Sequence, residues 1–337
     1  MRRKVLSRTW PTAILLAAAI PLHAQVDVPN EFSAGNTARA SEVNANFNTL
    51  ETGVNEALSQ LNSLNRIASS GDAAADGQAL RDAVESVGTG DDPVFIQLAA
   101  GTYDVGDSTL EVTGPVVIAG AGRTATTITG QPPGGDYRFP NGGSMLHVSG
   151  GGTLEIRNLT LDALSRSEEA VSNYAAALSV RGSGSSALVD NVRATLEIAE
   201  TGSGSPIAYT FYASEASTLH IVNSRADLPV DNSAITSNDA LMGVAADAGS
   251  AGGSTVEVIA SEVAGVQSGG SGTTVHLRGS AVGAASSGNA VRAVNNGTLK
   301  IATSRIDGAA TDEGGGGTLA CVHTYDTSYA ALGTACQ

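Results

Sequence analysis

The chain has 337 residues, 41 of them glycine, and its 33 acidic against 18 basic side chains give a formal net charge of −15. So acidic a chain is repelled by nucleic acid and by anionic membrane surfaces, and we expect neither as a partner. A row of carboxylates could bind Ca²⁺, but no Gly-Gly-x-Gly-x-Asp loop recurs, so the sequence predicts no cofactor and no metal.

The first 24 residues have the pattern of an export signal. Basic residues at positions 2–4 precede an apolar run at residues 13–22, and Ala24 supplies a small residue for cleavage. The run is too short for a permanent membrane span. Removal of residues 1–24 takes away four positive charges and moves the net charge from −15 to about −19. We therefore expect a mature protein that is secreted, periplasmic or held at the cell surface, without membrane insertion.

Residues 25–68 form an N-terminal extension that contains an amphipathic helix. Ser41 is a plausible N-cap, and apolar residues follow it at alternating steps of four and three, which is the seam of a short coiled coil. These residues are Val43, Phe47, Leu50, Val54, Ala57, Leu61 and Leu64. Two interpretations stay open: self-association, as a homotrimer through residues 41–68, or a single helix that covers the open end of the following body. Residues 69–92 are expected to contain a linker and a short helix at 79–87.

Residues 93–130 carry a recognisable series of motifs. A strand leads into Gly101-Thr102-Tyr103, and two further strands precede a Gly120-Ala121-Gly122 turn and the segment Thr126-Thr127-Ile128-Thr129-Gly130. This series resembles the opening coils of the pectin lyase-like right-handed parallel β-helix superfamily, which includes the pectinesterases. The resemblance implies a fold. The catalytic motifs of pectinesterases and polygalacturonases are not found in the middle coils, so no catalytic residue can be carried over to this chain.

The body, residues 93–320, repeats one block in which two short alternating strands flank a tight bend. Aligned copies place the bend residues in one column and apolar residues in two inward columns. The bend column is Asn158, Asn191, Asn223, Ala260, Gly279 and Thr303, and the inward columns are Leu154, Ala187, Leu219, Val256, Val275, Leu299 and Ile156, Val189, Ile221, Val258, Leu277, Ile301. Such units bury their apolar faces only by stacking. We therefore predict an all-β fold, a right-handed parallel β-helix. A β-sandwich is the alternative, but the constant register favours the solenoid.

Each of four long connections leads into the equivalent strand of its coil. They span about residues 130–144, 162–176, 195–209 and 226–240. They should rise along one side of the solenoid, and six of the thirteen aromatic residues fall in or beside them. Tyrosine rings match the apolar faces of sugars, and Arg and His supply polar contacts. The candidate substrate-binding residues are Tyr137, Arg138, His147, Tyr174, Arg181, Tyr209 and Tyr212, with Phe211 pointing inward beside an outward Tyr212. The alternative is that these rings only pack the loops.

Two outward columns carry charge. Arg193, Arg225 and Glu262 are expected to form structural ion pairs between adjacent coils. In the other column His220 and His276 fall two coils apart, roughly 10 Å at the spacing of β-strands, so we do not expect them to share a metal ion.

The two cysteines, Cys321 and Cys336, lie at the end of a chain predicted to be exported, so we expect them to form a disulfide. A loop of this size is worth roughly 3 kcal/mol in the chain-entropy model. Its expected role is to close a C-terminal cap, residues 321–337, over the last coil.

Three functions remain open. We favour a surface-interaction, adhesin-like protein that binds extracellular or envelope polysaccharide, with no catalysis assigned. The alternatives are a polysaccharide lyase, glycoside hydrolase or carbohydrate esterase, and a structural oligomeric solenoid. A catalytic site would need two carboxylates, or a carboxylate and an arginine, within reach of one bond.

Overall fold

The structure, a computed structural model, describes residues 29–30, 39–62, 64–90, 92–131, 135–136, 143–166, 173–200, 207–227, 230–231, 241–285, 288–313, 316–334 and 336. The chain divides into two compact units, residues 1–63 and 64–337. The expected signal segment lies outside the described residues.

The first unit contains helix α1 (Ala40–Asn62). The helix begins one residue before Ser41, so Ser41 is not its N-cap. Instead, the Arg39 amide donates to Glu42 Oε2 at 3.2 Å, which satisfies an amide at the start of the helix. Phe47, Leu50 and Val54 are 65%, 41% and 54% exposed, so the predicted apolar seam is uncovered in the single chain.

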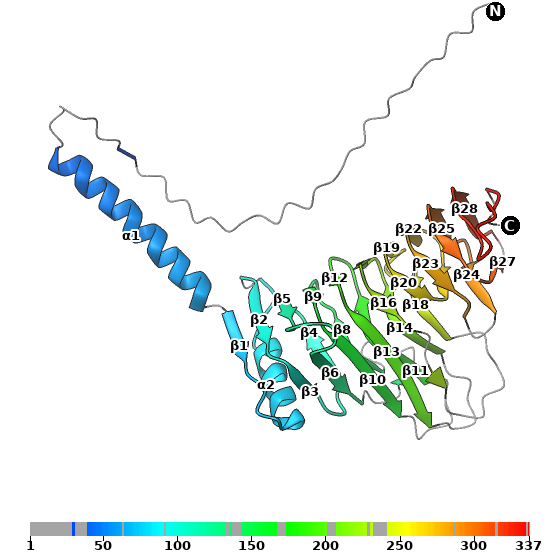
Figure 1. Ribbon diagram of the computed structural model, residues 1–337, viewed down its shortest axis with the longest axis horizontal. Coiled ribbons are helices and arrows are strands. Elements are labelled where there is room, and N and C mark those ends of the chain that lie inside the picture. The colour runs from blue at the N-terminus through cyan, green and yellow to red at the C-terminus, as the bar shows by residue number, and fades with distance from the viewer. Residues whose placement is uncertain are drawn as a thin grey trace, which may run out of the picture. The chain divides into compact units, whose positions relative to one another are not determined.

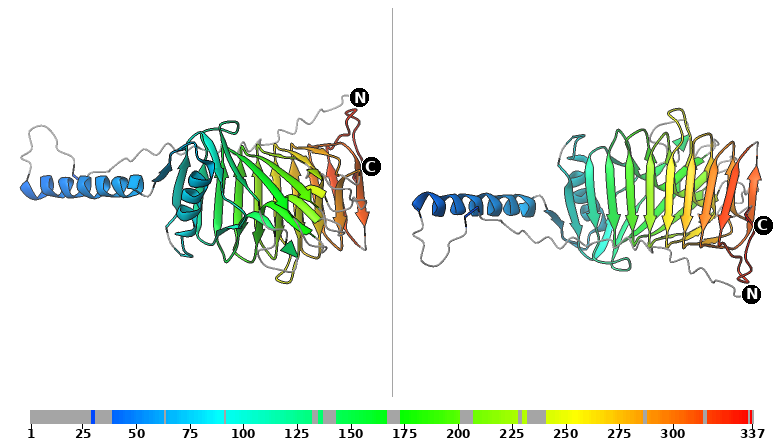
Figure 2. Two further views of the ribbon diagram at one scale, coloured as in Figure 1. Left: turned by 90° about the horizontal axis from the view of Figure 1, so that it is seen from below. Right: turned by 90° about the horizontal axis from the view of Figure 1, so that it is seen from above.

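The second unit is a parallel β-helix made of three sheets, which we name A, B and C (Figure 1). Figure 2 shows the strands of successive coils side by side in chain order. Sheet A contains, in order, β1 (Leu64–Ile67), β2 (Val94–Leu98), β5 (Pro115–Ala119), β9 (Thr153–Arg157), β12 (Ser186–Asp190), β15 (Thr218–Val222), β19 (Thr255–Ile259), β22 (Thr274–Arg278), β25 (Thr298–Ala302) and β28 (Thr318–Val322).

Sheet B follows sheet A within each coil. It contains β3 (Gly101–Asp104), β6 (Thr126–Gly130), β10 (Thr160–Arg166), β13 (Arg193–Glu200), β16 (Arg225–Ala226), β20 (Glu262–Ala264), β23 (Ala281–Gly283) and β26 (Arg305–Ile306), and β17 (Val230–Asp231) also pairs with β13. Sheet C precedes the next strand of sheet A. It contains β4 (Leu110–Val112), β8 (Ser144–Val148), β11 (Asn173–Arg181), β14 (Ile207–Ser214), β18 (Leu241–Asp247), β21 (Val266–Gly269), β24 (Asn289–Val294) and β27 (Ala309–Glu313), and β7 (Gly135–Asp136) pairs antiparallel with β11.

The two predicted inward columns are confirmed as continuous ladders of sheet A. Leu154 pairs with Ala187, Ala187 with Leu219, and the pairing continues without a shift to Leu299. Every member of both columns is at most 2% exposed and belongs to a single core. The β-sandwich alternative is therefore excluded, because the copies lie in one sheet in identical register. The predicted all-β parallel β-helix is thereby confirmed.

The predicted bend column is also confirmed. All six members have a left-handed backbone, with φ between 49° and 58°, and His323 (φ 51°) extends the column by one coil. The Asn191 side chain donates from Nδ2 to Asn158 Oδ1 at 2.8 Å, whereas Asn223 donates to Asp190 Oδ1 at 3.3 Å. Asparagine and glycine adopt this conformation at lower cost than other residues, which explains their recurrence at the bend.

The amino-terminal end of this unit differs from the boundaries expected from the sequence. Leu64 does not continue the helical seam but begins β1, which pairs in parallel with β2 and extends sheet A. Residues 73–79, assigned to a linker, belong to helix α2 (Ala73–Glu85), because Asp72 caps its first turn by accepting from the amides of Ala74 and Ala75. The solenoid therefore begins at Leu64 rather than at residue 93.

Helix α2 is fastened to the first coils by buried polar groups. Arg81 donates to the carbonyls of Val105, Ser108 and Thr109, and Gly77 lies so close to the backbone of Asp104 that a side chain there would collide with it. These contacts place α2 against β3 and β4.

The C-terminal end is closed by the predicted Cys321–Cys336 disulfide. Cys321 lies in the last strand of sheet A, and its amide donates to the Thr334 carbonyl at 2.9 Å. The chain after β28 thus folds back onto that strand. Searched over the described residues, no helix is long and apolar enough to cross a membrane.

Candidate functional site

The candidate site lies on the outer face of sheet C, where the alternation of inward and outward residues is interrupted. In β8 and β11 two consecutive residues belong to the core, Met145 with Leu146 and Ala177 with Leu178. Outward residues on either side of such a pair therefore stand three apart. In β14 these are Tyr209 and Tyr212, while Phe211 is fully buried in the core as predicted.

One outward column of sheet C is polar. Register aligns Glu111 with His147, His147 with Ser179, and Ser179 with Tyr212. His147 Nδ1 lies 2.6 Å from Ser179 Oγ, and both residues are 3% exposed. Burial, followed by the positive charge of Arg181, lowers the pKa of His147 to about 4, against which Glu215 acts weakly. The imidazole is therefore neutral at physiological pH.

Glu111, at the end of this column, is a partly buried carboxyl. Its Oε2 accepts a hydrogen bond from Ser149 Oγ at 3.3 Å, while its buried Oε1 has no hydrogen-bond partner among the described residues. Burial raises its pKa above the usual range, and the Ser149 bond opposes this only in part.

An ion pair borders the column. Arg181 donates to Glu215 Oε1 at 2.6 Å, and Ser250 Oγ lies 3.5 Å from the same oxygen. The Arg181 hydrogen bond is the main reason why the pKa of Glu215 is lowered. Only a quarter of the Arg181 side chain and a fifth of the Glu215 side chain are exposed, so this pair is better shielded from water than an ordinary surface pair.

The turn that carries Glu215 is unusual. Glu215 and Ala216 have φ of 59° and 61°, whereas the equivalent turns of other coils use Gly150-Gly151 and Asn295-Asn296. A left-handed conformation costs residues other than Gly and Asn about 1–2 kcal/mol each. The backbone conformation of the turn does not require a glutamate. We therefore attribute the presence of Glu215 to its contact with Arg181.

The two tyrosines form an apolar patch beside these charges. Their rings stack with centroids 5.1 Å apart and planes within 6°. Tyr209 is 8% exposed and packs with Ala176, Met242 and Ala245, whereas Tyr212 is only partly buried. Burial, followed by the charge of Asp247, raises the pKa of Tyr209 to about 12 and the pKa of Tyr212 further. Both phenols are therefore neutral hydrogen-bonding groups.

The structure brings four of the seven predicted binding residues together on this face: His147, Arg181, Tyr209 and Tyr212. Tyr174 lies in β11 and pairs with Ile207, but its side chain is not among those described. Tyr137 and Arg138 lie outside the described residues.

Two groups of the site were missed by sequence reasoning. Glu111 could have been found as a single acidic residue between two buried residues of a strand, and Glu215 as an acidic residue where related turns carry Gly or Asn. Within the described ranges no group of three or more His, Cys, Asp or Glu residues is arranged to hold a metal ion.

The other charged columns form structural contacts. Arg225 contacts Glu262 of the adjacent coil at 3.3 Å, as expected, and Asp227 of its own coil at 2.5 Å. His220 bonds Glu257 at 3.1 Å, and Glu257 lies between His220 and His276 in the register of sheet A. The two histidines are therefore two coils apart, as predicted.

Comparison with known proteins gives only distant similarities. No protein-family model matches the chain, and no curated protein matches its sequence. Among solved structures, a rice weevil pectin methyl esterase is 16% identical, with 76% of this chain and 78% of that chain covered and a TM-score of 0.43. The A-module of the mannuronan C-5 epimerase AlgE6 from Azotobacter vinelandii is 14% identical, with 78% and 88% covered and a TM-score of 0.28. At these TM-scores the similarities do not bear on activity.

Proposed function

We propose that this protein is an exported parallel β-helix that binds extracellular or envelope polysaccharide through the outer face of sheet C. The observation that carries the proposal is the Arg181–Glu215 pair, held beside Tyr212 by a turn that would be more stable with Gly or Asn. Arg181 supplies hydrogen-bond donors, Glu215 supplies acceptors, and the stacked rings of Tyr209 and Tyr212 supply phenol groups and an apolar surface. Proteins bind sugar rings through groups of these kinds.

Binding accounts for these groups better than catalysis does. His147 is almost fully buried and bonded to Ser179, so a substrate does not reach its Nδ1. Glu215 has a lowered pKa and stays ionised in its ion pair, which makes it a poor general acid. We therefore assign no catalytic step to this face, in keeping with a surface-interaction role.

A glycan array followed by calorimetric titration with the best binders tests the proposal. Arg181→Ala should weaken binding at least tenfold, whereas Arg193→Ala, which removes a salt-bridged arginine from sheet B, should change it less than twofold. Equal effects of the two substitutions, or no binding of any polysaccharide by the wild-type protein, would refute binding on sheet C.

A polysaccharide-degrading enzyme is the second candidate, and one observation favours it. Glu111 combines a raised pKa with a buried, unpartnered oxygen and pairs in register with His147, as a general acid in a binding groove would. Assays for reducing ends and for unsaturated products on acidic polysaccharides decide between the two. Turnover that disappears in Glu111→Gln would establish catalysis in place of simple binding.

We also propose that the exposed seam of α1 joins copies of the chain, as a homotrimer. Val43, Phe47, Leu50 and Val54 follow the heptad spacing, and the last three are exposed. Since Leu64 belongs to β1, the associating segment is shortened from residues 41–68 to the helix itself. A trimer would present three binding faces and so raise the avidity for a repetitive polysaccharide.

A further inference from the structure

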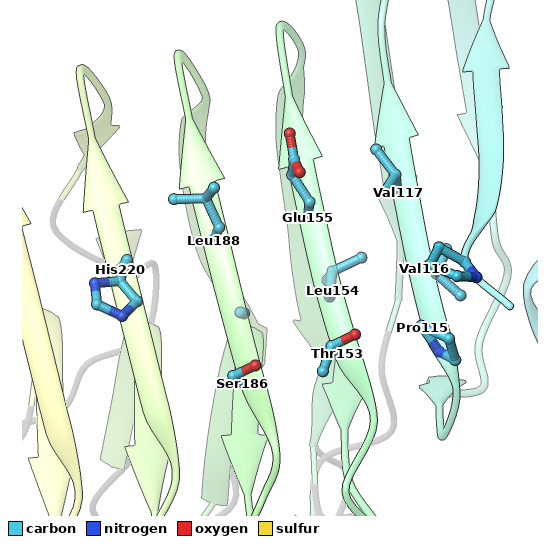
Figure 3. A pocket seen from close by; sticks show the side chains of 11 residues that line it. Pro115, Val116, Val117, Thr153, Leu154, Glu155, Ser186, Leu188 and His220 are labelled. Atoms are coloured by element: carbon cyan, nitrogen blue, oxygen red, sulfur yellow. The ribbon is translucent and has the colours of Figure 1, made fainter. Parts of the chain in front are cut away.

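Sheet A carries a concave site on its outer face. A pocket of about 310 Å³ runs across the amino-terminal halves of β5, β9, β12 and β15 (Figure 3). It lies on a different sheet from the site of the proposed function. Its volume is at the lower end of the range for small-molecule sites, which suits one or two sugar rings.

Apolar and polar side chains alternate along the pocket in register. Val117, Glu155, Leu188 and His220 follow one another on successive strands. Strands lie about 4.8 Å apart, so the apolar contacts Val117 and Leu188 are separated by about 10 Å along the solenoid. An elongated ligand that lies across the strands meets an apolar surface, a polar group and an apolar surface in turn.

The polar groups of the pocket mostly accept hydrogen bonds. Glu155 is held by Arg157 at 3.0 Å. His220 Nδ1 lies 3.1 Å from a Glu257 carboxylate oxygen, so Nε2 is the ring nitrogen left for a ligand. The hydroxyls of Thr153 and Ser186 have no side-chain hydrogen bond to any described residue, so both can serve a ligand as donor or acceptor.

This chemistry matches a ligand with many hydroxyl donors and flat apolar faces. Glu155 in the pocket and the net charge of −15 act against a uronic-acid ligand. Building on the proposed function, we propose that the pocket is a second glycan site, selective for neutral sugars and separate from the face of sheet C. A neutral chain lies along the solenoid with its rings on Val117 and Leu188 and its hydroxyls on Glu155, Ser186 and His220.

Calorimetric titration with cellohexaose, mannohexaose and hexagalacturonate tests this assignment on the full chain. Ser186→Phe fills the pocket and should weaken binding of a neutral hexaose at least tenfold. Thr298→Phe is the matched control, because Thr298 belongs to the same register column four coils away, and it should leave binding unchanged. Phenylalanine is favoured at outward strand positions, so both variants should fold. Leu188→Thr, which keeps a side chain suited to a strand, should weaken binding less but in the same direction.

The outcomes separate this inference from the proposed function. Binding of a neutral hexaose that is lost in Ser186→Phe but kept in Arg181→Ala supports the second site. Binding that is weakened by Arg181→Ala but unchanged by both Ser186→Phe and Leu188→Thr refutes the second site and leaves the proposed function standing. Binding of hexagalacturonate alone refutes the selectivity for neutral sugars, and binding of no glycan at all refutes both proposals.

Discussion

The bend column of the solenoid allows a quantitative prediction at Asn191. This residue has φ 52°, and its side chain donates to Asn158 Oδ1 at 2.8 Å. Asn191→Ala removes the hydrogen bond, worth about 1 kcal/mol, and forces alanine into a left-handed conformation at a cost of about 1–2 kcal/mol. We expect a total loss of about 2–3 kcal/mol in the free energy of unfolding.

Asn191→Gly separates the two contributions. Glycine adopts the left-handed backbone freely but makes no side-chain bond, so this variant should lose only about 1–1.5 kcal/mol. Ala260 provides the reverse test, because it has φ 49° in the same column. Ala260→Gly should stabilise the protein by about 0.5–1 kcal/mol, since relief of the strain exceeds the added entropy of the unfolded chain.

Urea unfolding followed by far-UV circular dichroism measures all three variants against the wild-type protein. The midpoints should rank Ala260→Gly first, then wild type, Asn191→Gly and Asn191→Ala, with unchanged slopes. If Asn191→Ala is as stable as Asn191→Gly, or Ala260→Gly lowers the midpoint, the backbone argument for the column is wrong.

Three further predictions concern the disulfide, the buried histidine and the helix. Replacing Cys321 and Cys336 by serine should lower the free energy of unfolding by about 3 kcal/mol, and dithiothreitol should destabilise the wild-type protein but not the double variant. The pKa of His147 is about 4 in the folded chain against 6.5 unfolded, so only the unfolded chain binds this proton between those values. Stability should therefore fall by up to about 3 kcal/mol as the pH drops from 6.5 to 4, and denaturant titrations of His147→Gln should show a shallower fall. Leu50→Asp should convert the proposed trimer to a monomer in sedimentation equilibrium, whereas a wild-type protein that is already monomeric would contradict self-association through α1.

The sheet A ladders and their bends could be predicted from the sequence because the same types of residue recur at the same positions of each repeated block. Leu154, Leu219 and Leu299 stand at the same point of each block, and each predicted bend from Asn158 onward contains a left-handed residue. Connections of different lengths change the spacing along the chain but not the order within the block. The fold could therefore be inferred without knowledge of the loops.

The sheet C site could be predicted only in part, because its strands break the alternation of inward and outward residues. Tyr209 and Phe211 are two apart and would share a face in a regular strand, yet only Phe211 enters the core. His147 was expected as an exposed polar contact and is 3% exposed, since burial depends on neighbouring coils. The contact between Arg181 and Glu215 joins different coils and depends on a turn conformation that the residue types do not indicate.

The start of the solenoid was misplaced for a different reason. Leu64 continues the four-three spacing of the helix, whereas the segment Leu64-Asn65-Arg66-Ile67 does not alternate between apolar and polar residues, so its local pattern did not indicate a strand. Parallel pairing of Leu64 to Ile67 with Phe95 to Leu98 of β2 places this segment in sheet A.

The register of sheet A also shows how such a protein can change its length. Thr255 pairs with Thr274, only 19 residues later, and this winding meets its neighbours through the same columns as every other. Since both ends of the body are closed by other elements, duplication or deletion of residues 255–273 would lengthen or shorten the array without exposing a new terminus. This coil is thus a suitable unit for tandem duplication within the gene, and for engineered variants that are one coil longer or shorter.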